Sequence, residues 1–264
     1  MNDRSDMKDG GDDPRVALIV GGGSGIGYAT AERLVRRGVD VAIAGRREDV
    51  LLEARESLEA IAAGASIAVV AGDAGIESQA QAIASSCVEQ LGRLDVCVNC
   101  AGMYEPVDFL EMNEEAWRRT MASSLDSMTY ASVAAARAMK SAGAGGRFVL
   151  ISSINAPSSE PESAHYSAAK AGVASLARSM AVDLAKYGIQ ANAVAPGWVH
   201  TAMVDDFVRD ATAETLKQLN VLARVGQPDE LANVIEYLGF DAPDYLTGAT
   251  IFVDGGQTAM APLI

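Results

Sequence analysis

The sequence predicts a single α/β domain with a doubly wound parallel sheet of about seven strands and helices on both faces. The first observation is a series of short apolar runs, typical of strands that are buried on both faces of a parallel sheet. The second is that these runs alternate with helical patterns along the 264-residue chain, joined by short links. The third is a glycine-rich turn between the first run and the first helical pattern. Right-handed crossovers would place helices on both faces.

The apolar runs locate the strands in order. We expect strands at residues 15–20, 41–44, 66–71, 94–98, 146–152, 190–195 and 249–253. Apolar residues recur at helical spacing between these runs. We expect helices from the glycine turn to about residue 37 and at residues 48–63, 77–91, 114–142, 165–187 and 228–238.

One segment interrupts this alternation. Residues 204–220 predict one or two short helices, within an excursion from the sheet at about residues 198–222. Residues 1–13 are charged and contain glycine, which predicts a disordered tail. We therefore expect one domain over residues 14–264.

Composition narrows the possible functions. The formal net charge of −14 argues against a nucleic-acid surface, because neutralising phosphates requires clustered Lys and Arg. It also argues against recruitment to anionic lipid. The sequence has no apolar run long enough to span a bilayer, and its start lacks the apolar core of a signal peptide. We expect a cytoplasmic protein with a small-molecule substrate, no nucleic-acid partner and no membrane.

No metal site is predicted. Cys97 and Cys100 form a C-x-x-C sequence at a strand and its exit, where residues three apart point to opposite faces. The two histidines, His165 and His200, are isolated in the sequence. With Cys87 the thiols are odd in number, so we interpret them as buried small side chains in a reducing compartment.

The glycine-rich turn predicts a dinucleotide site. Glycines let the backbone approach a pyrophosphate, which then rests against the unpaired N–H groups of the following helix. The position between a strand and an amphipathic helix favours this Rossmann-type interpretation over an ordinary tight turn. The candidate cofactor-binding residues in the turn are Gly21, Gly23, Ser24, Gly25, Ile26 and Gly27.

The end of the second strand indicates which dinucleotide would bind. In such folds an acidic residue about 20 positions after the turn holds the adenosine ribose hydroxyls. Here Gly45 takes that place, and Arg46 and Arg47 follow. A guanidinium can bind a 2′-phosphate bidentately and stack on adenine. NADP(H) is therefore the preferred cofactor and NAD(H) the alternative, unless the two arginines are only the solvated start of a helix.

A tyrosine and a lysine four residues apart predict an acid–base pair. Tyr166 and Lys170 would lie one helical turn apart on the same face. An ammonium about 4 Å from the phenol, at an effective dielectric near 20, is worth about 4 kcal/mol. That energy would lower the phenol pKa, normally about 10, by roughly three units. We expect this tyrosine to exchange protons with a substrate oxygen near neutral pH.

Several motifs occur together in one order: the glycine turn, Asn99-Cys-Ala-Gly102, Ser153 thirteen residues before Tyr166, Tyr166-x-x-x-Lys170 and Pro196-Gly197. Together they make the chain resemble the short-chain dehydrogenase/reductase family in its single-domain form, over about residues 14–258. The resemblance implies an oxidoreductase that transfers a hydride reversibly between NADP(H) and a ketone or secondary alcohol.

The resemblance also implies roles for single residues. Ser153 would orient the substrate carbonyl, Tyr166 would exchange the proton, and Lys170 would lower the tyrosine pKa and hold the nicotinamide ribose. The remaining positions that match cofactor-contacting motifs of the family are Asp73, Ala74, Asn99, Ala101, Gly102, Pro196, Gly197, Val199 and Thr201.

Two positions depart from the family pattern. Val20 stands where the glycine motif usually has Thr, which leaves the phosphate-facing backbone intact. Ser124 stands seven residues after Trp117, where the family often has an Asn that anchors a water chain from the lysine to solvent. A hydroxyl binds water but lacks the geometry of an amide. Ser124 therefore serves a modified relay, or proton exchange takes another route.

The substrate would lie beside Ser153. Further candidate contacts are Met103, Asn155, Trp198, Met203 and Phe207. Glu160 and Glu162 lie in the loop before Tyr166 and would disfavour anionic substrates if they faced the pocket. We expect both of these carboxylates to be solvated.

Three alternatives stay open. They are an NAD(H)-dependent alcohol dehydrogenase of the same family, a 3-oxoacyl-type ketoreductase, and a non-catalytic nucleotide-binding regulatory protein. Val20 and Ser124 support the last of these, and the −14 charge disfavours an acidic carrier-protein partner. The resemblance also implies a homotetramer or homodimer, formed through the helices at 114–142 and 165–187 and the last strand.

Overall fold

The computed structural model describes residues 15–260, except for the side chains of residues 206–208. Its framework is one seven-stranded parallel sheet in the order β3-β2-β1-β4-β5-β6-β7. The strands are β1 (Val16–Val20), β2 (Asp40–Gly45), β3 (Ile67–Ala71), β4 (Val96–Asn99), β5 (Gly146–Ile151), β6 (Ile189–Pro196) and β7 (Thr250–Val253). The predicted fold class is confirmed, and each strand ends close to its predicted limits.

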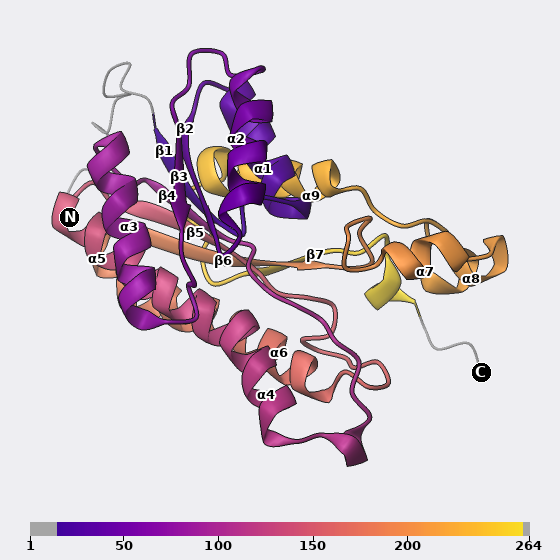
Figure 1. The fold of residues 1–264 in the computed structure, drawn as a ribbon. Helices are drawn as coiled ribbons and strands as arrows, with labels where there is room; N and C mark the ends of the chain where they lie inside the picture. Colours follow the sequence, from indigo (N-terminus) through magenta and orange to yellow (C-terminus); the bar gives the residue numbers. More distant parts are fainter. Residues whose placement is uncertain (1–14, 261–264) are drawn as a thin grey trace.

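Helices cover both faces of the sheet (Figure 1). One face carries α1 (Gly25–Arg36), α2 (Glu48–Glu59) and α9 (Pro228–Glu236). The other face carries α3 (Glu77–Leu91), α5 (Ser127–Ala142) and α6 (Ala164–Leu184), with α4 (Glu114–Met121) beside α6. The result is a single Rossmann-like domain in three layers.

The core lies in and against the central strands. Every residue of β1 and β4 is buried, and Phe148 of β5 is among the largest fully buried side chains. Alanines on α5 and α6 are buried as well. Packing on both faces fixes the carboxyl ends of these strands, where ligands bind in doubly wound sheets.

The stretch predicted at residues 114–142 is helical throughout, but it is not a regular α-helix over its whole length. A π-helical turn, η2 (Ala122–Asp126), separates α4 from α5. Within and beside it, Ser123 Oγ donates to the Thr120 carbonyl at 3.2 Å and Ser127 Oγ donates to the Ser123 carbonyl at 2.7 Å. Such bonds compete with regular helical pairing. π turns often occur at functional sites, and this one carries Ser124.

The excursion predicted after the sixth strand is present. It contains α7 (Asp205–Asp210) and α8 (Ala213–Leu219), which project from the body of the molecule (Figure 1). It rejoins the domain at Asn220, whose side-chain amide donates to the Arg224 carbonyl at 2.7 Å. The tail predicted for residues 1–13 lies outside the described residues.

Short helical turns complete the chain. They are η1 (Phe109–Glu111), η3 (Ala185–Tyr187), η4 (Tyr237–Asp241) and η5 (Gln257–Ala259). Between residues 15 and 260, no helix has both the length and the apolar character required to cross a membrane. The same residues contain no cluster of three or more His, Cys, Asp or Glu side chains that could hold a metal ion.

Candidate active site

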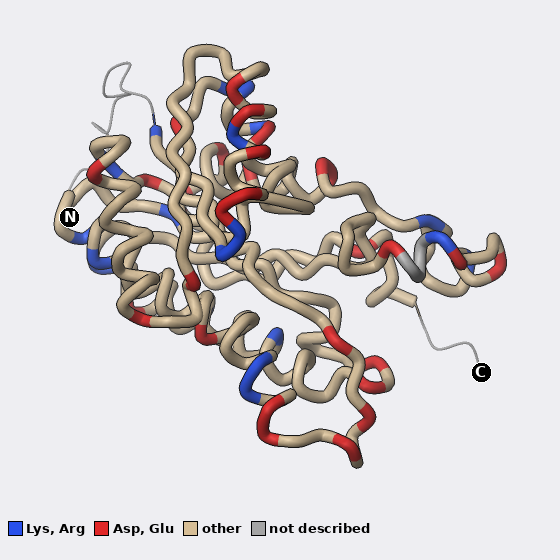
Figure 2. Tube along the Cα trace, in the orientation of Figure 1, with Lys and Arg blue, Asp and Glu red and all other residues tan. Residues whose placement is uncertain are grey.

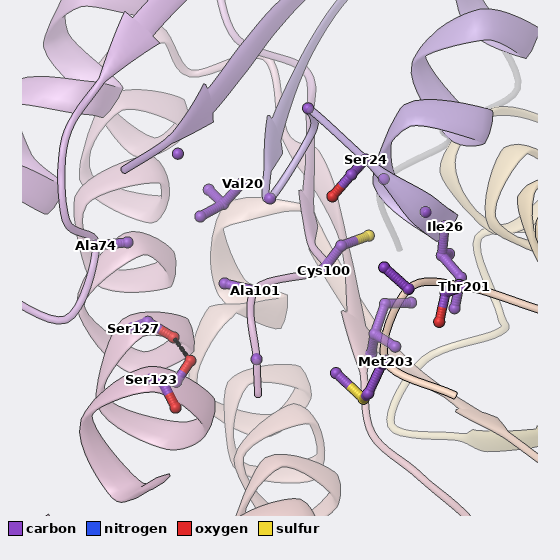
Figure 3. A pocket seen from close by; sticks show the side chains of 18 of the residues that line it. Val20, Ser24, Ile26, Ala74, Cys100, Ala101, Ser123, Ser127, Thr201 and Met203 are labelled. Atoms are coloured by element: carbon purple, nitrogen blue, oxygen red, sulfur yellow. Dashed lines mark hydrogen bonds between the residues drawn. The ribbon is translucent and has the colours of Figure 1, made fainter. Parts of the chain in front are cut away.

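A cavity of about 380 Å³ lies at the carboxyl ends of the central strands. Segments far apart in the sequence line it: the glycine turn, the ends of β2 to β6, the π turn, α6 and the chain after β6 (Figure 3). All the residues predicted to contact the cofactor line this cavity, with the exception of Asn99. Motifs that the sequence spreads over about 180 positions therefore meet at one place.

The glycine turn forms a backbone cradle on one side of the cavity. Gly21 and Gly25 have φ of +83° and +54°, in the left-handed region that favours glycine. A Cβ on Gly27 would lie 2.1 Å from the Gly21 carbonyl oxygen, so α1 can start this close to the turn only with glycine there. Ser24, the N-cap residue, makes no side-chain capping bond. The first N–H groups of α1 therefore stay available for an anion such as a pyrophosphate.

The chain after β6 closes over the same helix end. A Cβ on Gly25 would lie 3.2 Å from Cγ2 of Thr201. Thr201 and Ile26 both line this edge of the cavity (Figure 3). A hydroxyl thus stands beside the backbone cradle, as the sequence motif predicts for a diphosphate contact.

Arg46 and Arg47 line the cavity beyond the end of β2. Both side chains are exposed, and neither makes an ion pair with any residue that the structure describes. Asp73 is turned back on its own loop, where its Oδ1 accepts from the Gly75 N–H at 2.9 Å. The two guanidinium groups are free to bind a phosphate monoester at this position.

Lys170 extends from α6 into the cavity, where it is 4% exposed. Its Nζ donates to the Ile151 carbonyl at the end of β5 at 2.9 Å and lies 5.5 Å from the centroid of the Tyr166 ring. Burial lowers the pKa of Lys170 to about 8, and interaction with Cys100 partly offsets that effect. The ammonium is therefore held by one carbonyl and by the face of the tyrosine.

The pKa of Tyr166 differs from the sequence-based expectation. Burial raises the pKa to about 12, although a hydrogen bond with Ser153 acts in the opposite direction. The ammonium of Lys170 faces the ring of Tyr166 and donates its hydrogen bond to Ile151. Desolvation of the phenolate is therefore the largest influence on the pKa of Tyr166. The expectation of a lowered pKa is therefore wrong for this structure. Tyr166 is a neutral phenol at neutral pH and has a proton to donate.

Ser153 lies just beyond the end of β5 and is 8% exposed. Its Oγ accepts from the Asn155 N–H at 3.1 Å, and its side chain interacts with the Tyr166 hydroxyl, which lowers the pKa of that phenol. The two hydroxyl groups therefore stand together in the cavity wall. Such a pair can donate two hydrogen bonds to one substrate oxygen.

Ser124 is fully buried on the π turn. Its Oγ donates to the Met103 carbonyl and accepts from the Met103 N–H, both at 3.3 Å. A Cβ on Gly102 would lie 3.3 Å from Lys170 Nζ and 3.6 Å from Ser124 Oγ. The hydroxyl and the ammonium are therefore near one backbone position, as a proton relay would require.

Asn99 is the one predicted cofactor residue that does not line the cavity. The side chain of Asn99 is fully buried, and its Nδ2 donates to Ser132 Oγ at 2.9 Å and to the Met128 carbonyl at 3.4 Å. These bonds fasten the end of β4 to α5. Asn99 thus supports the turn that carries Ala101 and Gly102 and does not itself line the cavity.

Cys100, Ser123 and Ser127 are among the lining residues that the sequence did not predict. Cys100 lines the cavity next to Lys170, and burial raises the pKa of its thiol to about 12. Ser123 reaches the cavity from the π turn and Ser127 from the start of α5 (Figure 3). The Asn-x-Ala-Gly motif contains Cys100 and could have drawn attention to it. The two serines had no sequence signal, because a regular α-helix was expected over residues 114–142 and nothing in the sequence indicated the π turn.

The predicted substrate residues fall into two groups. Ser153 and Met203 line the cavity, whereas Met103 contacts Ser124 through its backbone. The prediction for Phe207 concerns a side chain outside the part that the structure describes.

Asn155 and Trp198 meet at Glu160. Asn155 Nδ2 donates to Glu160 Oε2 at 3.4 Å, and Trp198 Nε1 donates to Glu160 Oε1 at 3.3 Å. Glu160 is therefore partly exposed and has two side-chain partners, whereas a fully solvated carboxylate was expected. Glu162, by contrast, is exposed as expected.

The parallel sheet and the glycine cradle define a dinucleotide-binding protein, and comparisons with known proteins identify the family. A family model described as "Enoyl-(Acyl carrier protein) reductase" matches residues 21–258. A cis-4-hydroxycyclohexanecarboxylate dehydrogenase of Sinomonas cyclohexanicum is 39% identical, over 93% of this chain and 97% of its own. An L-rhamnose 1-dehydrogenase (NAD(P)(+)) of Azotobacter vinelandii is 37% identical, over 92% and 96%.

A solved structure agrees with these sequence matches. A short-chain type dehydrogenase/reductase from Mycobacterium ulcerans has a TM-score of 0.88 and 34% identity, over 93% of this chain and 90% of that one. The chain therefore belongs to the short-chain dehydrogenase/reductase family. It is an NAD(P)-dependent oxidoreductase that acts on CH–OH or C=O groups.

Proposed function

We propose that this protein transfers a hydride reversibly between NADP(H) and a ketone or secondary alcohol, with Tyr166 as proton donor and acceptor. The observation that carries the proposal is that Ser153, Tyr166 and Lys170 line the same cavity as the glycine cradle. Similarity to dehydrogenases named for L-rhamnose and for cis-4-hydroxycyclohexanecarboxylate supports a CH–OH substrate.

The cradle fits a dinucleotide. The backbone of residues 21–27 and the hydroxyl of Thr201 would hold the diphosphate, and Lys170 would hold the nicotinamide ribose. Arg46 and Arg47 would bind the 2′-phosphate, because no carboxylate at the end of β2 repels it. The bound cofactor supplies the hydride, and the protein supplies position and electrostatics.

Ser153 and Tyr166 act on the substrate oxygen. In reduction both hydroxyls donate hydrogen bonds to the carbonyl oxygen, which stabilises the negative charge that develops on it. Tyr166 then gives its proton to that oxygen, and its raised pKa keeps this proton in place at neutral pH. In alcohol oxidation the phenolate accepts the proton. The ammonium of Lys170 over the ring stabilises that phenolate.

Ser124 would take part in proton resupply. Its hydroxyl lies close to Lys170 beside Gly102 and is bonded to both backbone groups of Met103. We infer that it holds one end of a water-mediated path between the lysine and solvent, at the position where the family often has Asn. This path would return a proton to Tyr166 through Lys170.

A cofactor and substrate panel tests the proposed reaction. The purified protein is mixed with NADPH or NADH and a series of ketones, and with NADP⁺ or NAD⁺ and the matching alcohols. We expect turnover, followed by nicotinamide absorbance, with a higher kcat/KM for NADP(H). Cofactor binding without turnover of any compound would contradict the proposal and favour a non-catalytic nucleotide-binding protein.

We also infer a homotetramer in the cytoplasm. The three cysteines Cys87, Cys97 and Cys100 are all free thiols, which supports a reducing compartment. Val133 on α5 and Val182 on α6 leave apolar surface exposed on the helices expected to form the interfaces. Sedimentation equilibrium tests the assembly: a monomer at micromolar concentration would contradict it, and a dimer would leave only one of the expected interfaces.

A further inference from the structure

Glu160 lies in the loop between β5 and α6 and is tied to the start of α6. Its N–H donates to Ser163 Oγ at 3.1 Å, and Ser163 Oγ donates back to the Glu160 carbonyl at 2.6 Å. Ser163 is the residue that precedes α6, and Tyr166 is in the first turn of that helix. The backbone of Glu160 is therefore anchored to the element that carries the proposed acid–base residue.

The carboxylate of Glu160 connects two loops beside the reacting hydroxyls. It accepts hydrogen bonds from Asn155 of the loop after β5 and from Trp198 of the chain after β6. The N–H of Asn155 itself donates to Ser153 Oγ. The negative charge of Glu160 also reaches Tyr166, because it contributes to the raised pKa of that phenol.

Aromatic side chains lie near Glu160, and one of them, Tyr166, lines the cavity. The rings of Tyr104 and Tyr166 pack edge to face with their centroids 5.2 Å apart. Burial raises the pKa of Tyr104, and the charges of Glu160 and Glu162 raise it further, whereas of these two carboxylates only Glu160 acts on Tyr166. Tyr104, Tyr166 and Trp198 thus surround a carboxylate that is half-buried.

The charge of Glu160 has no cationic partner among the residues that the structure describes. Both of its side-chain partners are neutral, an amide and an indole. A carboxylate has about four acceptor positions, so it can accept further hydrogen bonds. The segments around it are acidic as well: red Asp and Glu positions mark the chain leading into α4 and the loop before α6 (Figure 2). Arg119, the nearby cation on α4, pairs with Glu105 and Glu115.

We propose that Glu160 is a specificity residue that selects substrates with a hydroxyl group near the reacting carbon and disfavours those with a carboxylate there. The carboxylate accepts a hydrogen bond from the substrate hydroxyl and repels a substrate anion. Asn155 and Trp198 hold it in the required orientation. This inference rests on the proposed function, since it concerns the substrate of the same site.

Matched ketone pairs test this inference in the presence of NADPH. The pairs are hydroxyacetone with pyruvate, and 4-hydroxy-2-butanone with acetoacetate. We expect the wild-type protein to prefer the hydroxyl member of at least one pair. In Glu160→Gln that preference should fall by about tenfold, the effect of one charge-assisted hydrogen bond. The change should be mainly in KM.

Glu162→Gln is the matched control. It removes the same charge two residues away, from an exposed side chain, and should leave the preference unchanged.

The pH profile gives a second measurement. In Glu160→Gln, the rise of alcohol oxidation with pH should move to lower pH, because the charge that raises the Tyr166 pKa is gone. A purely structural role would reduce both members of a pair equally and would not move the profile.

The outcomes separate this inference from the proposed function. If the wild-type protein reduces the probes but Glu160→Gln keeps the same preference, or if the carboxylate members are preferred, only the role of Glu160 is overturned. Wild-type turnover by Tyr166→Phe would overturn the proposed function. A complete absence of turnover with every pair would overturn both.

Discussion

The two sides of the cavity are built differently. The cofactor side is mostly backbone: glycines 21, 25 and 27, the helix N-terminus behind them, and the chain after β6 that meets Gly25. On the substrate side Ser153 and Tyr166 line the cavity, and next to them, outside its lining, Glu160 is bonded to Asn155 and Trp198 and Tyr104 packs on Tyr166. Backbone geometry tolerates no added atom, whereas a side-chain wall can be rebuilt. The first side should therefore define the cofactor, and the second should define the substrate.

The largest effect should come from the cofactor side, at Gly27. In Gly27→Ala the new Cβ would lie 2.1 Å from the Gly21 carbonyl oxygen, so the turn or α1 must shift. We expect loss of NADPH binding and a free energy of unfolding that is lower by about 3 kcal/mol. Fluorescence titration and denaturant unfolding measure the two quantities. The control is Gly226→Ala, where the nearest atom to the new Cβ is 3.5 Å away. If Gly27→Ala binds NADPH as the wild-type protein does, the glycine turn is not the site of the diphosphate.

The next effect concerns the hydroxyl pair. Ser153→Ala removes a donor to the substrate oxygen and should lower kcat by about 100-fold. It also removes the hydrogen bond that lowers the pKa of Tyr166, so this pKa should rise above its value of about 12. Alcohol oxidation requires the phenolate, and its rise with pH should therefore move to higher pH. Ser158→Ala, which removes only a bond to the Ile154 carbonyl, should show neither change.

The guanidinium pair should have a smaller and selective effect. Replacing Arg46 and Arg47 together by Ala should weaken NADPH binding by about tenfold or more, the loss expected for charge-assisted bonds to a phosphate. NADH binding should change little. Arg36→Ala, which removes an exposed arginine paired with Glu32, is the control. Equal losses for both cofactors would assign the arginines a role other than binding the 2′-phosphate.

The smallest effect is expected at Ser124, which we place on the path that resupplies protons to Lys170. Ser124→Ala should lower kcat severalfold without changing the KM for NADPH, and small buffer acids should restore part of the rate. The free energy of unfolding should fall by about 1 kcal/mol, because the Met103 backbone groups lose their partner. Ser124→Asn should keep wild-type turnover. If kcat is unaltered in Ser124→Ala, proton resupply takes another route.

The fold and the cofactor side could be predicted from the sequence for a steric reason. A residue such as Gly27 is fixed by one close backbone contact, and Gly21 and Gly25 by positive φ. These constraints act over a few neighbouring residues and leave a spacing pattern in the sequence. The strands also leave a local pattern in the sequence, because burial on both faces of the sheet requires apolar side chains throughout each strand.

The substrate side could not be predicted in this way. Whether Glu160 meets Trp198, 38 positions away, depends on how two loops fold against each other. The π turn that brings Ser123 to the cavity depends on bonds between serine hydroxyls and backbone carbonyls within an otherwise regular helical pattern.

The pKa of Tyr166 shows the same limit. Spacing correctly placed Lys170 next to the ring, but the sequence did not show that the ammonium bonds to Ile151 and that burial dominates. The sign and the size of the pKa shift of Tyr166 depend on what surrounds both the phenol and the ammonium of Lys170 in the folded protein.

Tyr166→Phe tests the central claim most directly. The substitution keeps the ring that packs against Tyr104 and Lys170 and removes only the hydroxyl. NADPH affinity, measured by fluorescence titration, should equal that of the wild-type protein, and ketone reduction should fall by about 1,000-fold or more. Turnover within tenfold of the wild-type rate, or loss of NADPH binding together with activity, would contradict the account.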